Sequence, residues 1–521
     1  MYKKIAVFML MVAASFSFAA CDFFNGTKTS TETTIQESTT RETSVISSTE
    51  INVTTLTTEE MTTETITTTE PITTTEITTV PTTTTTEETT TINTATPIIP
   101  TGYSLLQDEL ENIGIPSVGE SKVLVFAVDF SDYTYLQAGM SISEIETAFN
   151  GSSDDLDFES LNSYYQISSY GKLDITADVF GFYRADYPAS YYEEEYYKLW
   201  ATDPITGEWL YDDDEVTYAD SDLIYEVLSF YDSQIDYSDY DSNGDGLIDG
   251  IYIIYSYPVS WTGDSYLWWA YQDYYAYYDN FDGVEPMYFV WSGYEFFHDN
   301  SDNIDARTII HETGHMMGLD DYYDYYPYDS QNSGGLGGAD MMDSAYGDHG
   351  PFSKILLGWI TPLVVEEAMT IDIGPFVESG EVILLIDQWN NTIFDEYLLI
   401  SYYSPTGLNY ADRNELFTIP GIIIYHVSAA IGGGYDPDSY YYSIFNNNNT
   451  DSTNKLIDII EADMDNYIDR YSYIENEDLF RVGDVLGGNI YPTYQWYNHT
   501  YIGYDIRIVS IVSGVAKIQI T

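Results

Sequence analysis

Two of the six histidines in this 521-residue chain stand in the segment HETGHMMGLDD, residues 311–321. His311 and His315 are four residues apart, so on a helix both imidazoles lie on one face, with Glu312 between them in sequence. Gly318 lets the chain turn after the helix and return Asp321 toward the histidines. Two imidazole nitrogens and one carboxylate oxygen leave a fourth tetrahedral position for water, which is typical of a catalytic zinc site.

Two other interpretations compete with this one. An HExxH pattern also arises by chance in long chains, and then it has no metal. The Gly-x-x-Asp extension and the scarcity of other histidines favour zinc. Alternatively, zinc binds but takes its third ligand from further along the chain; the candidates are Asp324, Asp340 and Asp343. Asp321 is preferred because only Asp321 has the glycine turn that would deliver it.

A second pattern of oxygen ligands lies in DYDSNGDGLIDG, residues 239–250. Positions 1, 3, 5 and 9 of a calcium-binding loop are occupied by Asp241, Asn243, Asp245 and Asp249. Position 12 is Tyr252 rather than the bidentate acid of an EF-hand, and a strand is expected to follow. We therefore expect a structural calcium site, with a plain acidic turn as the alternative.

The elements that must position these residues are partly visible in the sequence. Residues 121–130 form an almost continuous apolar run that predicts a buried strand. Residues 221–230 have helical apolar spacing behind possible caps at Ser221 and Asp222. Before the histidine pair, Asp302 or Asn303 is a possible helix cap, and residues 309–310 are expected to face the core.

The N-terminus has the pattern of an export signal. Lys3 and Lys4 precede an apolar run that ends in small residues before Cys21, the only cysteine of the chain. The segment FAAC is similar to the lipobox of bacterial lipoproteins, although Phe18 stands where Leu is usual. We expect residues 1–21 to be a lipoprotein-type signal and Cys21 to be acylated; the alternatives are an uncleaved anchor or a plain signal.

Residues 22–100 are rich in Thr, Ser, Glu and Ile, with few aromatic residues and no periodic apolar face. Such a segment cannot bury enough apolar surface to offset its ordering entropy, so it predicts a disordered stalk. Over the whole chain, 85 acidic residues against 16 basic ones give a formal net charge of −69. This charge argues against nucleic acid and anionic lipid as partners, because both would be repelled.

The rest of the chain is long enough for two domains, expected at residues 101–365 and 366–521. Beyond residue 365 the sequence predicts one strand after another, in EVILLID, EYLLISYY, GIIIYHV, KLIDIIEAD, YDIRIVSIV and VAKIQIT. His426, within GIIIYHV, is expected to be a half-buried strand residue rather than a ligand. We expect an α+β protein whose C-terminal region is a β-sandwich.

Several segments resemble the immune inhibitor A family of secreted zinc metallopeptidases, which is metzincin-like. They are SYGKLDITADVFGFY (169–183), QIDYSDYDSNGDGLIDG (234–250), HETGHMMGLDDYYD (311–324), DMMDS (340–344) and KILLGWI (354–360), in that family's order. The resemblance implies a zinc endopeptidase in which Glu312 is the catalytic base and Met342 forms the turn beneath the metal. Ser344 stands where many metzincins have a tyrosine, which leaves Tyr346 or His349 as substitutes.

The resulting hypothesis is a surface-tethered extracellular enzyme, attached or shed, that hydrolyses protein or peptide substrates with zinc and contains structural calcium. Its contact with the membrane would be through the lipid at Cys21 only. The alternative hypothesis is a non-catalytic adhesion or binding protein built on a peptidase-like fold. An intact Glu312 favours the enzyme.

Overall fold

The structure is a computed structural model of the full chain. It describes residues 95–202, 210–211, 216–260, 267–298, 303–325, 335–410, 416–436, 441–450, 454–465, 468–469, 473–487 and 494–521. The signal, Cys21 and nearly all of the expected stalk lie outside these ranges. Within them, no helix is both long and apolar enough to cross a membrane.

The part of the chain up to residue 360 alternates helices and strands. Its strands are β1 (Gly119–Asp129), β2 (Leu173–Arg184), β3 (Ile251–Tyr255), β4 (Tyr271–Tyr274) and β5 (Tyr288–Gly293). Its helices are α2 (Leu106–Glu109), α3 (Tyr135–Ala138), α4 (Ile142–Asn150), α5 (Leu161–Ser168), α6 (Ala189–Trp200), α7 (Ala219–Tyr231), α8 (Arg307–Met316), α9 (Met341–Ser344) and α10 (Pro351–Leu356). Short 3-10 helices are η2 (Ser153–Asp155), η3 (Tyr237–Tyr240) and η4 (Tyr294–His298).

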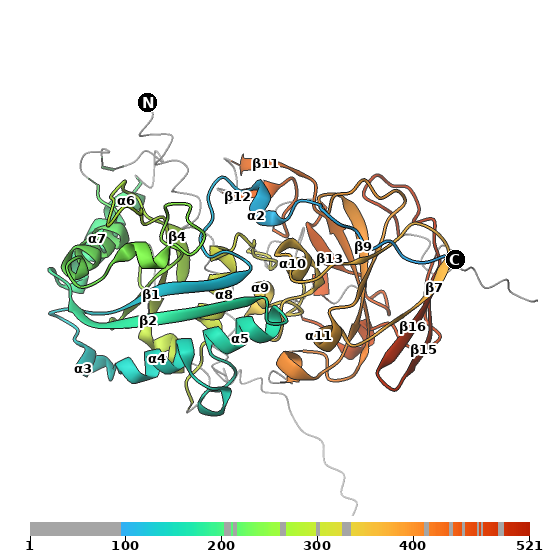
Figure 1. The fold of residues 1–521 in the computed structure, drawn as a ribbon, viewed down its shortest axis with the longest axis horizontal. Helices are drawn as coiled ribbons and strands as arrows, with labels where there is room; N and C mark the ends of the chain where they lie inside the picture. The colour runs from blue at the N-terminus through green and yellow to red at the C-terminus, as the bar shows by residue number, and fades with distance from the viewer. Residues whose placement is uncertain are drawn as a thin grey trace, which may run out of the picture. The chain divides into compact units, whose positions relative to one another are not determined.

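The five strands form one sheet in the order β2-β1-β3-β5-β4. Its pairs are parallel except that the edge strand β4 runs antiparallel to β5. Strand β1 is buried on both faces, as its apolar sequence predicts. Val123, Val125 and Ala127 pack in the core that contains α4, α5 and α8, whereas Leu124 and Phe126 pack against α6 and α7. Helices therefore cover both faces of the sheet (Figure 1).

Helix α7 begins two residues earlier than predicted, with Tyr218 at the N-cap. Ser221 and Asp222 are therefore helical residues and not caps. Their side chains are used in tertiary contacts: the Ser221 hydroxyl accepts from the Ala276 N–H at 3.0 Å, and Asp222 accepts from the Tyr277 hydroxyl at 2.6 Å. Because their side chains bond residues 276 and 277, Ser221 and Asp222 do not cap the helix, which starts at Ala219.

The predicted cap of α8 is also displaced. The helix starts at Arg307, beyond Asn303, and Asp302 lies outside the described residues. Asp305 replaces them, because its carboxylate accepts from the main-chain N–H of Arg307 at 2.9 Å and also pairs with the Arg307 guanidinium. A buried carboxylate thus satisfies one free amide of the first turn and one buried cation.

The chain after residue 360 is mostly β. Its strands are β6 (Leu363–Val365), β7 (Met369–Ile373), β8 (Val382–Leu385), β9 (Glu396–Tyr403), β10 (Gly421–Ser428), β11 (Ile431–Asp436), β12 (Tyr441–Phe445), β13 (Ile457–Ile459), β14 (Val485–Leu486), β15 (Ile506–Val512) and β16 (Val515–Ile520). It also contains α11 (Phe376–Ser379), η5 (Gly407–Tyr410) and η6 (Asn476–Asp478). The six strands predicted here are all present, although β13 covers only three residues of KLIDIIEAD.

Two sheets of this region share a core. One has the order β13-β10-β9-β8-β6 and the other β14-β15-β16-β7, and a hairpin of β11 and β12 is separate. Residues such as Leu398 and Ile424 of the first sheet lie in one apolar cluster with Ile371, Ile508 and Ile518 of the second. Alternate residues of β9 and β10 instead belong to the core that contains α8. The first sheet therefore links the site-bearing half to the second sheet.

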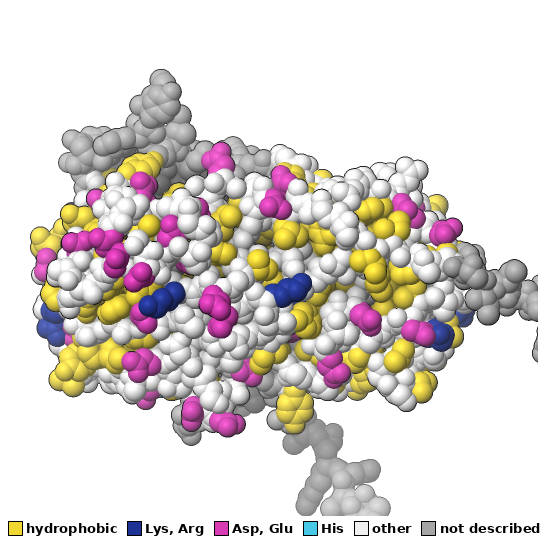
Figure 2. All heavy atoms as spheres, viewed as in Figure 1, with side chains coloured by type: hydrophobic (Ala, Val, Ile, Leu, Met, Phe, Trp, Pro, Cys, Tyr) yellow, Lys and Arg dark blue, Asp and Glu magenta, His cyan; other side chains and the backbone are white. Residues whose placement is uncertain are grey.

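The described residues, from 95 onward, belong to one compact unit. The described chain enters it before residue 101, because Ile98 pairs with Val364 of β6. The last residues of the expected stalk, from 95, are thus part of the fold, and that boundary was placed too late. On the face shown in Figure 2, acidic side chains are spread over the surface and basic ones are few, as the composition requires.

Candidate metal centre

Helix α8 presents the histidine pair from the core of the protein. Ile309 and Ile310 are fully buried, as predicted, and they hold the helix against the sheet. The helix ends at Met316, and Gly318 adopts a φ of 95°, a conformation that glycine tolerates best. Main-chain bonds from Gly318 to His315 (2.8 Å) and from Leu319 to Gly314 (3.2 Å) close the turn.

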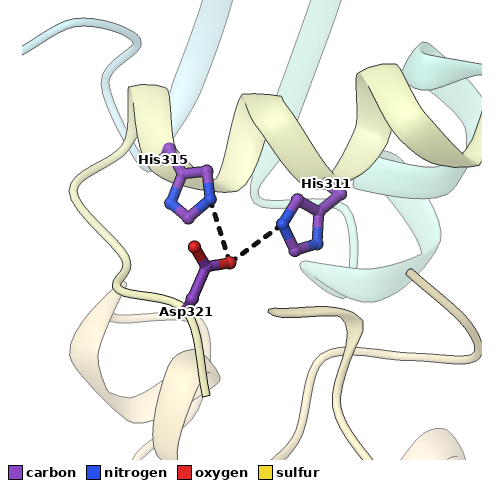
Figure 3. Close-up of side chains that lie close together, drawn as sticks. All are labelled: His311, His315 and Asp321. Atoms are coloured by element: carbon purple, nitrogen blue, oxygen red, sulfur yellow. Dashed lines mark hydrogen bonds and ion pairs between the residues drawn. The ribbon is translucent and has the colours of Figure 1, made fainter. Parts of the chain in front are cut away.

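The turn returns Asp321 to the two histidines. Nε2 of His311 lies 3.0 Å from Oδ1 of Asp321. Nε2 of His315 lies 3.2 Å from the same oxygen, in an ion-pair contact without hydrogen-bond geometry. Figure 3 shows both rings on α8 pointing at this one carboxylate. One ligand atom from each residue lies within 4.8 Å of the others, so the three predicted ligands do meet.

The other nitrogen of each ring is held by a main-chain carbonyl. Nδ1 of His311 lies 2.8 Å from the carbonyl oxygen of Met341, and Nδ1 of His315 lies 2.7 Å from that of Leu319. A carbonyl only accepts, so each Nδ1 carries the proton and each Nε2 is left to bind a metal when the ring is neutral. Outer-shell bonds of this kind orient metal-binding histidines.

The three groups are strongly coupled electrostatically. Burial by itself lowers the pKa of His315, but the charge and hydrogen bond of Asp321, the charge of Glu312 and the Leu319 carbonyl together outweigh burial and raise that pKa to about 10. Burial raises the pKa of Asp321, but the charges and hydrogen bonds of His315 and His311 together lower it more. The pKa of Asp321 therefore falls well below its usual range. The donor set of two nitrogens and one oxygen is buried and prepared for a cation, and it fits zinc.

Glu312 lies beside the histidines and is only 1% exposed. Its Oε2 has no hydrogen-bond partner among the residues that the structure describes. Burial raises the pKa of Glu312, although the charges of His311 and His315 and the main-chain N–H of Gln272 on β4 lower it. A buried carboxylate with an unused oxygen at the histidine pair is suited to accepting a proton.

Met342 lies under the helix between the two histidines. An added Cβ on Gly314 would overlap the Met342 sulfur, so the helix and the methionine are in direct contact there. The preceding residue, Met341, supplies the carbonyl to His311, and the Met342 carbonyl accepts from the Tyr322 N–H at 2.9 Å. Both methionines are fully buried core residues, as ordinary packing predicts, and they contact α8 at Gly314 and His311.

The alternative third ligands do not join this group. Asp340 caps α9 and also accepts from the Gly350 N–H at 2.7 Å. Asp343 accepts from the main-chain amides of Leu336 and Gly338. Asp324 is buried but is not among the ligand atoms that converge on the histidines.

Neither proposed substitute for the metzincin tyrosine lies free beside the metal ligands. His349 is fully buried, with ring contacts to Tyr164, Tyr165 and Trp359. Tyr346 lies with its ring over the Arg307 guanidinium, 5.1 Å away. Both residues therefore have packing roles in the described structure.

Sequence reasoning missed two tyrosines that hold Asp321. The hydroxyls of Tyr323 and Tyr325 donate to Oδ2 of Asp321 at 3.0 and 2.6 Å. They orient the carboxylate so that Oδ1 faces the histidines. Their proximity to Asp321 in sequence is a signal, but a chain with 53 tyrosines makes that signal weak.

The side chains of the expected calcium loop form hydrogen bonds within the loop itself. The Asp241 carboxylate accepts from the main-chain amides of Gly244, Asp245 and Gly246 at 2.8, 3.1 and 3.0 Å. The Asn243 amide donates to Asp245 at 2.9 Å. These are the contacts of an acidic turn, and a cation would have to compete with them.

Asp249 differs from the rest of the loop. It is 1% exposed; its Oδ1 accepts from the Ser242 N–H at 3.2 Å, and its Oδ2 has no partner among the described residues. Strand β3 follows, so an EF-hand is excluded as predicted. No three loop carboxylates converge within 4.8 Å in the described part of the chain, and the calcium assignment stays a prediction.

His426 is not part of any group of converging ligands in the described ranges. It lies on β10 and is 2% exposed, more buried than predicted. Its Nε2 lies 2.9 Å from Glu396, and its ring stacks on Tyr497.

No model of a known protein family matches the chain, and no curated protein matches it either. The likeness to the immune inhibitor A family therefore rests on the short segments named above.

Proposed function

We propose that the chain is a zinc endopeptidase related to the immune inhibitor A family. The observation that carries this proposal is the convergence of the His311 and His315 Nε2 atoms on Oδ1 of Asp321, with both Nδ1 atoms held by carbonyls. A structural histidine pair would not need two nitrogens aimed at one buried oxygen. Metal ligands do, because the cation takes the space between them.

Zinc bound by these residues would activate water and polarise the scissile carbonyl. The residues of the chain do the remaining work. Glu312, on the same helix, accepts a proton from the attacking water and passes it to the leaving nitrogen. Its burial in an apolar core supports both steps, because a raised pKa makes the carboxylate a better base and its acid form easier to populate.

The edge strand β4 gives the substrate a place beside the base. The main-chain N–H of its Gln272 donates to Glu312, so this N–H faces away from β5 toward the site. An extended peptide can pair with the exposed edge of a sheet through main-chain hydrogen bonds. We infer that substrate lies along β4 with its scissile bond near Glu312.

The finer architecture belongs to the same proposal. A metzincin-like domain is supported by the contact of Met342 with Gly314 beneath the histidines. A C-terminal β-sandwich is supported by the shared apolar cluster of the two sheets. Export and a lipid anchor at Cys21 are supported by the N-terminal sequence alone.

The test is zinc analysis of the purified full chain, paired with casein hydrolysis. We expect close to one zinc per chain and hydrolysis that a chelator abolishes and added zinc restores. A chain that holds zinc at this site but cleaves no protein or peptide would be the non-catalytic binding protein. A chain without zinc would refute the proposal altogether.

A further inference from the structure

A second group of converging ligands lies in the C-terminal half. One carboxylate oxygen from each of Glu461, Asp463 and Asp478 lies within 4.8 Å of the others. Glu461 and Asp478 are buried, at 7% and 2% exposure, whereas Asp463 is exposed. Three carboxylates at these distances repel one another unless a positive charge lies between them.

Asp478 points to a ligand independently of this clustering. Its Oδ2 accepts from the Glu475 N–H at 2.6 Å. Its Oδ1 is buried and has no hydrogen-bond partner among the described residues. A buried carboxylate oxygen without a partner is costly, and a coordinated cation is one of the few groups that removes the cost.

We propose that Glu461, Asp463 and Asp478 bind a calcium ion. An all-oxygen, carboxylate-rich donor set selects a hard cation over zinc. Calcium–oxygen distances of about 2.3–2.6 Å allow ligands up to roughly 5 Å apart across the ion, which the observed spread fits. The exposed side of Asp463 leaves room for the waters that complete a calcium shell.

The site lies at the base of the segment between Ile460 and Phe480, an excursion that leaves strand β10 and returns to it. The Ala462 N–H donates to the carbonyl of Asp478 at 3.0 Å, so the two ends of the excursion already meet. Both ends are fixed to strand β10, because Ile460 donates to Ile424 and Phe480 pairs with Ile422. A cation at this point would tie the excursion to the sheet.

The same excursion contacts the zinc-site half. The N–H of Ile474 donates to the carbonyl of Gly337 at 3.3 Å. Gly337 precedes Asp340 and Met341, and the Met341 carbonyl holds His311. Calcium would therefore also restrain the segment from Gly337 to Met341, whose last carbonyl orients His311. The calcium site itself does not depend on the proposed peptidase activity.

The experiment is calcium titration of the zinc-saturated full chain by calorimetry, with melting temperature as a second readout. Asp478→Asn and Asp463→Asn should each lose one bound calcium per chain and part of the calcium-induced rise in melting temperature. The matched control is Glu477→Gln, an exposed acid of η6 outside the group, which should bind as the wild type does.

Asp463 is exposed, so its replacement tests the site even if Asp478→Asn fails to fold. A calcium bound at 241–249 would remain in both variants and would be lost in Asp249→Asn, so the two sites are distinguishable. If Asp463→Asn and every folded Asp478 variant bind as much calcium as the wild type, with unchanged affinity, the proposal is overturned.

Discussion

Nε2 of His311 lies 3.0 Å from Oδ1 of Asp321, and Nε2 of His315 approaches the same oxygen at 3.2 Å. The three side chains thus converge on one point, which Glu312 flanks. The arrangement separates two roles that mutagenesis can distinguish, because three residues would hold the metal and one would move the proton.

Glu312→Gln tests the proton carrier. The amide has nearly the same shape but cannot accept a proton from water, so hydrolysis should fall by about 10²- to 10⁴-fold. Zinc content should stay close to one per chain, because the metal ligands are untouched. Casein hydrolysis and elemental analysis of the same preparation measure both quantities. Wild-type activity in this variant would rule out the mechanism.

Asp321→Ala tests the third ligand. Loss of a direct ligand should lower zinc affinity by more than about 100-fold, because even outer-shell partners are worth 10–100-fold. Activity should fall with zinc content and recover in part when zinc is added. A competition titration with a chromogenic chelator measures the affinity.

Two variants bracket this result. Asp320→Ala removes a neighbouring acid whose carboxylate bonds the Ser443 hydroxyl, and it should retain zinc. Tyr325→Phe removes one donor to Asp321 and no ligand, so its loss should be only about 10–100-fold. Retention of zinc by Asp321→Ala, with loss in Asp324→Ala, Asp340→Ala or Asp343→Ala, would show that the ligand was assigned incorrectly.

Gly314→Ala tests the contact between α8 and the methionine turn. The new methyl group would overlap Met342, and such overpacking typically costs about 1–3 kcal/mol in the free energy of unfolding. Zinc affinity should fall as well, since the histidines flank position 314. Thermal unfolding and the chelator titration give the two values.

Met342→Ala provides the control for this pair. Alone it should destabilise the protein by about 2–5 kcal/mol, because it leaves a cavity. In the double variant the new methyl group occupies part of that space. The double variant should therefore be destabilised by less than the sum of the two single variants. Strict additivity would mean that the two residues do not contact each other.

Asp249→Asn tests the calcium loop. Burial and the charge of Asp241 raise the pKa of Asp249 to about 6, against the opposing hydrogen bonds from Ser242. The folded-state pKa lies above the unfolded one, so ionised Asp249 reduces stability at neutral pH unless a cation compensates. Without calcium the variant should be at least as stable as the wild type, and it should lose part of the calcium-induced rise in melting temperature.

Asp239→Asn is the matched control, because Asp239 is an exposed acid just before the loop. Its response to calcium should equal that of the wild type. An Asp249→Asn protein with the full calcium response would reduce the loop to an acidic turn.

Cys21→Ser tests the anchor. If Cys21 is acylated, its replacement should move the protein from the membrane fraction to the medium, which immunoblotting of the two fractions detects. Mass spectrometry of the wild-type N-terminus is the direct check. An unacylated wild-type protein that is already free in the medium would contradict the lipoprotein assignment.

The sequence by itself determined the features that depend on neighbouring residues. The spacing of His311, His315 and Asp321 and the glycine between them predict the three converging ligands, because helix pitch and the left-handed turn are local properties. Apolar runs located β1 and most C-terminal strands for the same reason. The strand after Asp249 excluded an EF-hand.

Only the tertiary structure decided the features that join distant segments. In α7, the side chains expected to act as caps instead bond Ala276 and Tyr277. In α8, the carboxylate of Asp305 takes the place of the expected cap. The Met341 carbonyl that orients His311 comes from a residue thirty positions further on. The grouping of Glu461, Asp463 and Asp478 likewise depends on where the chain re-enters beside β10. Such single contacts between distant segments depend on how the whole core packs, and, unlike apolar faces, they do not repeat at helix or strand spacing in the local sequence.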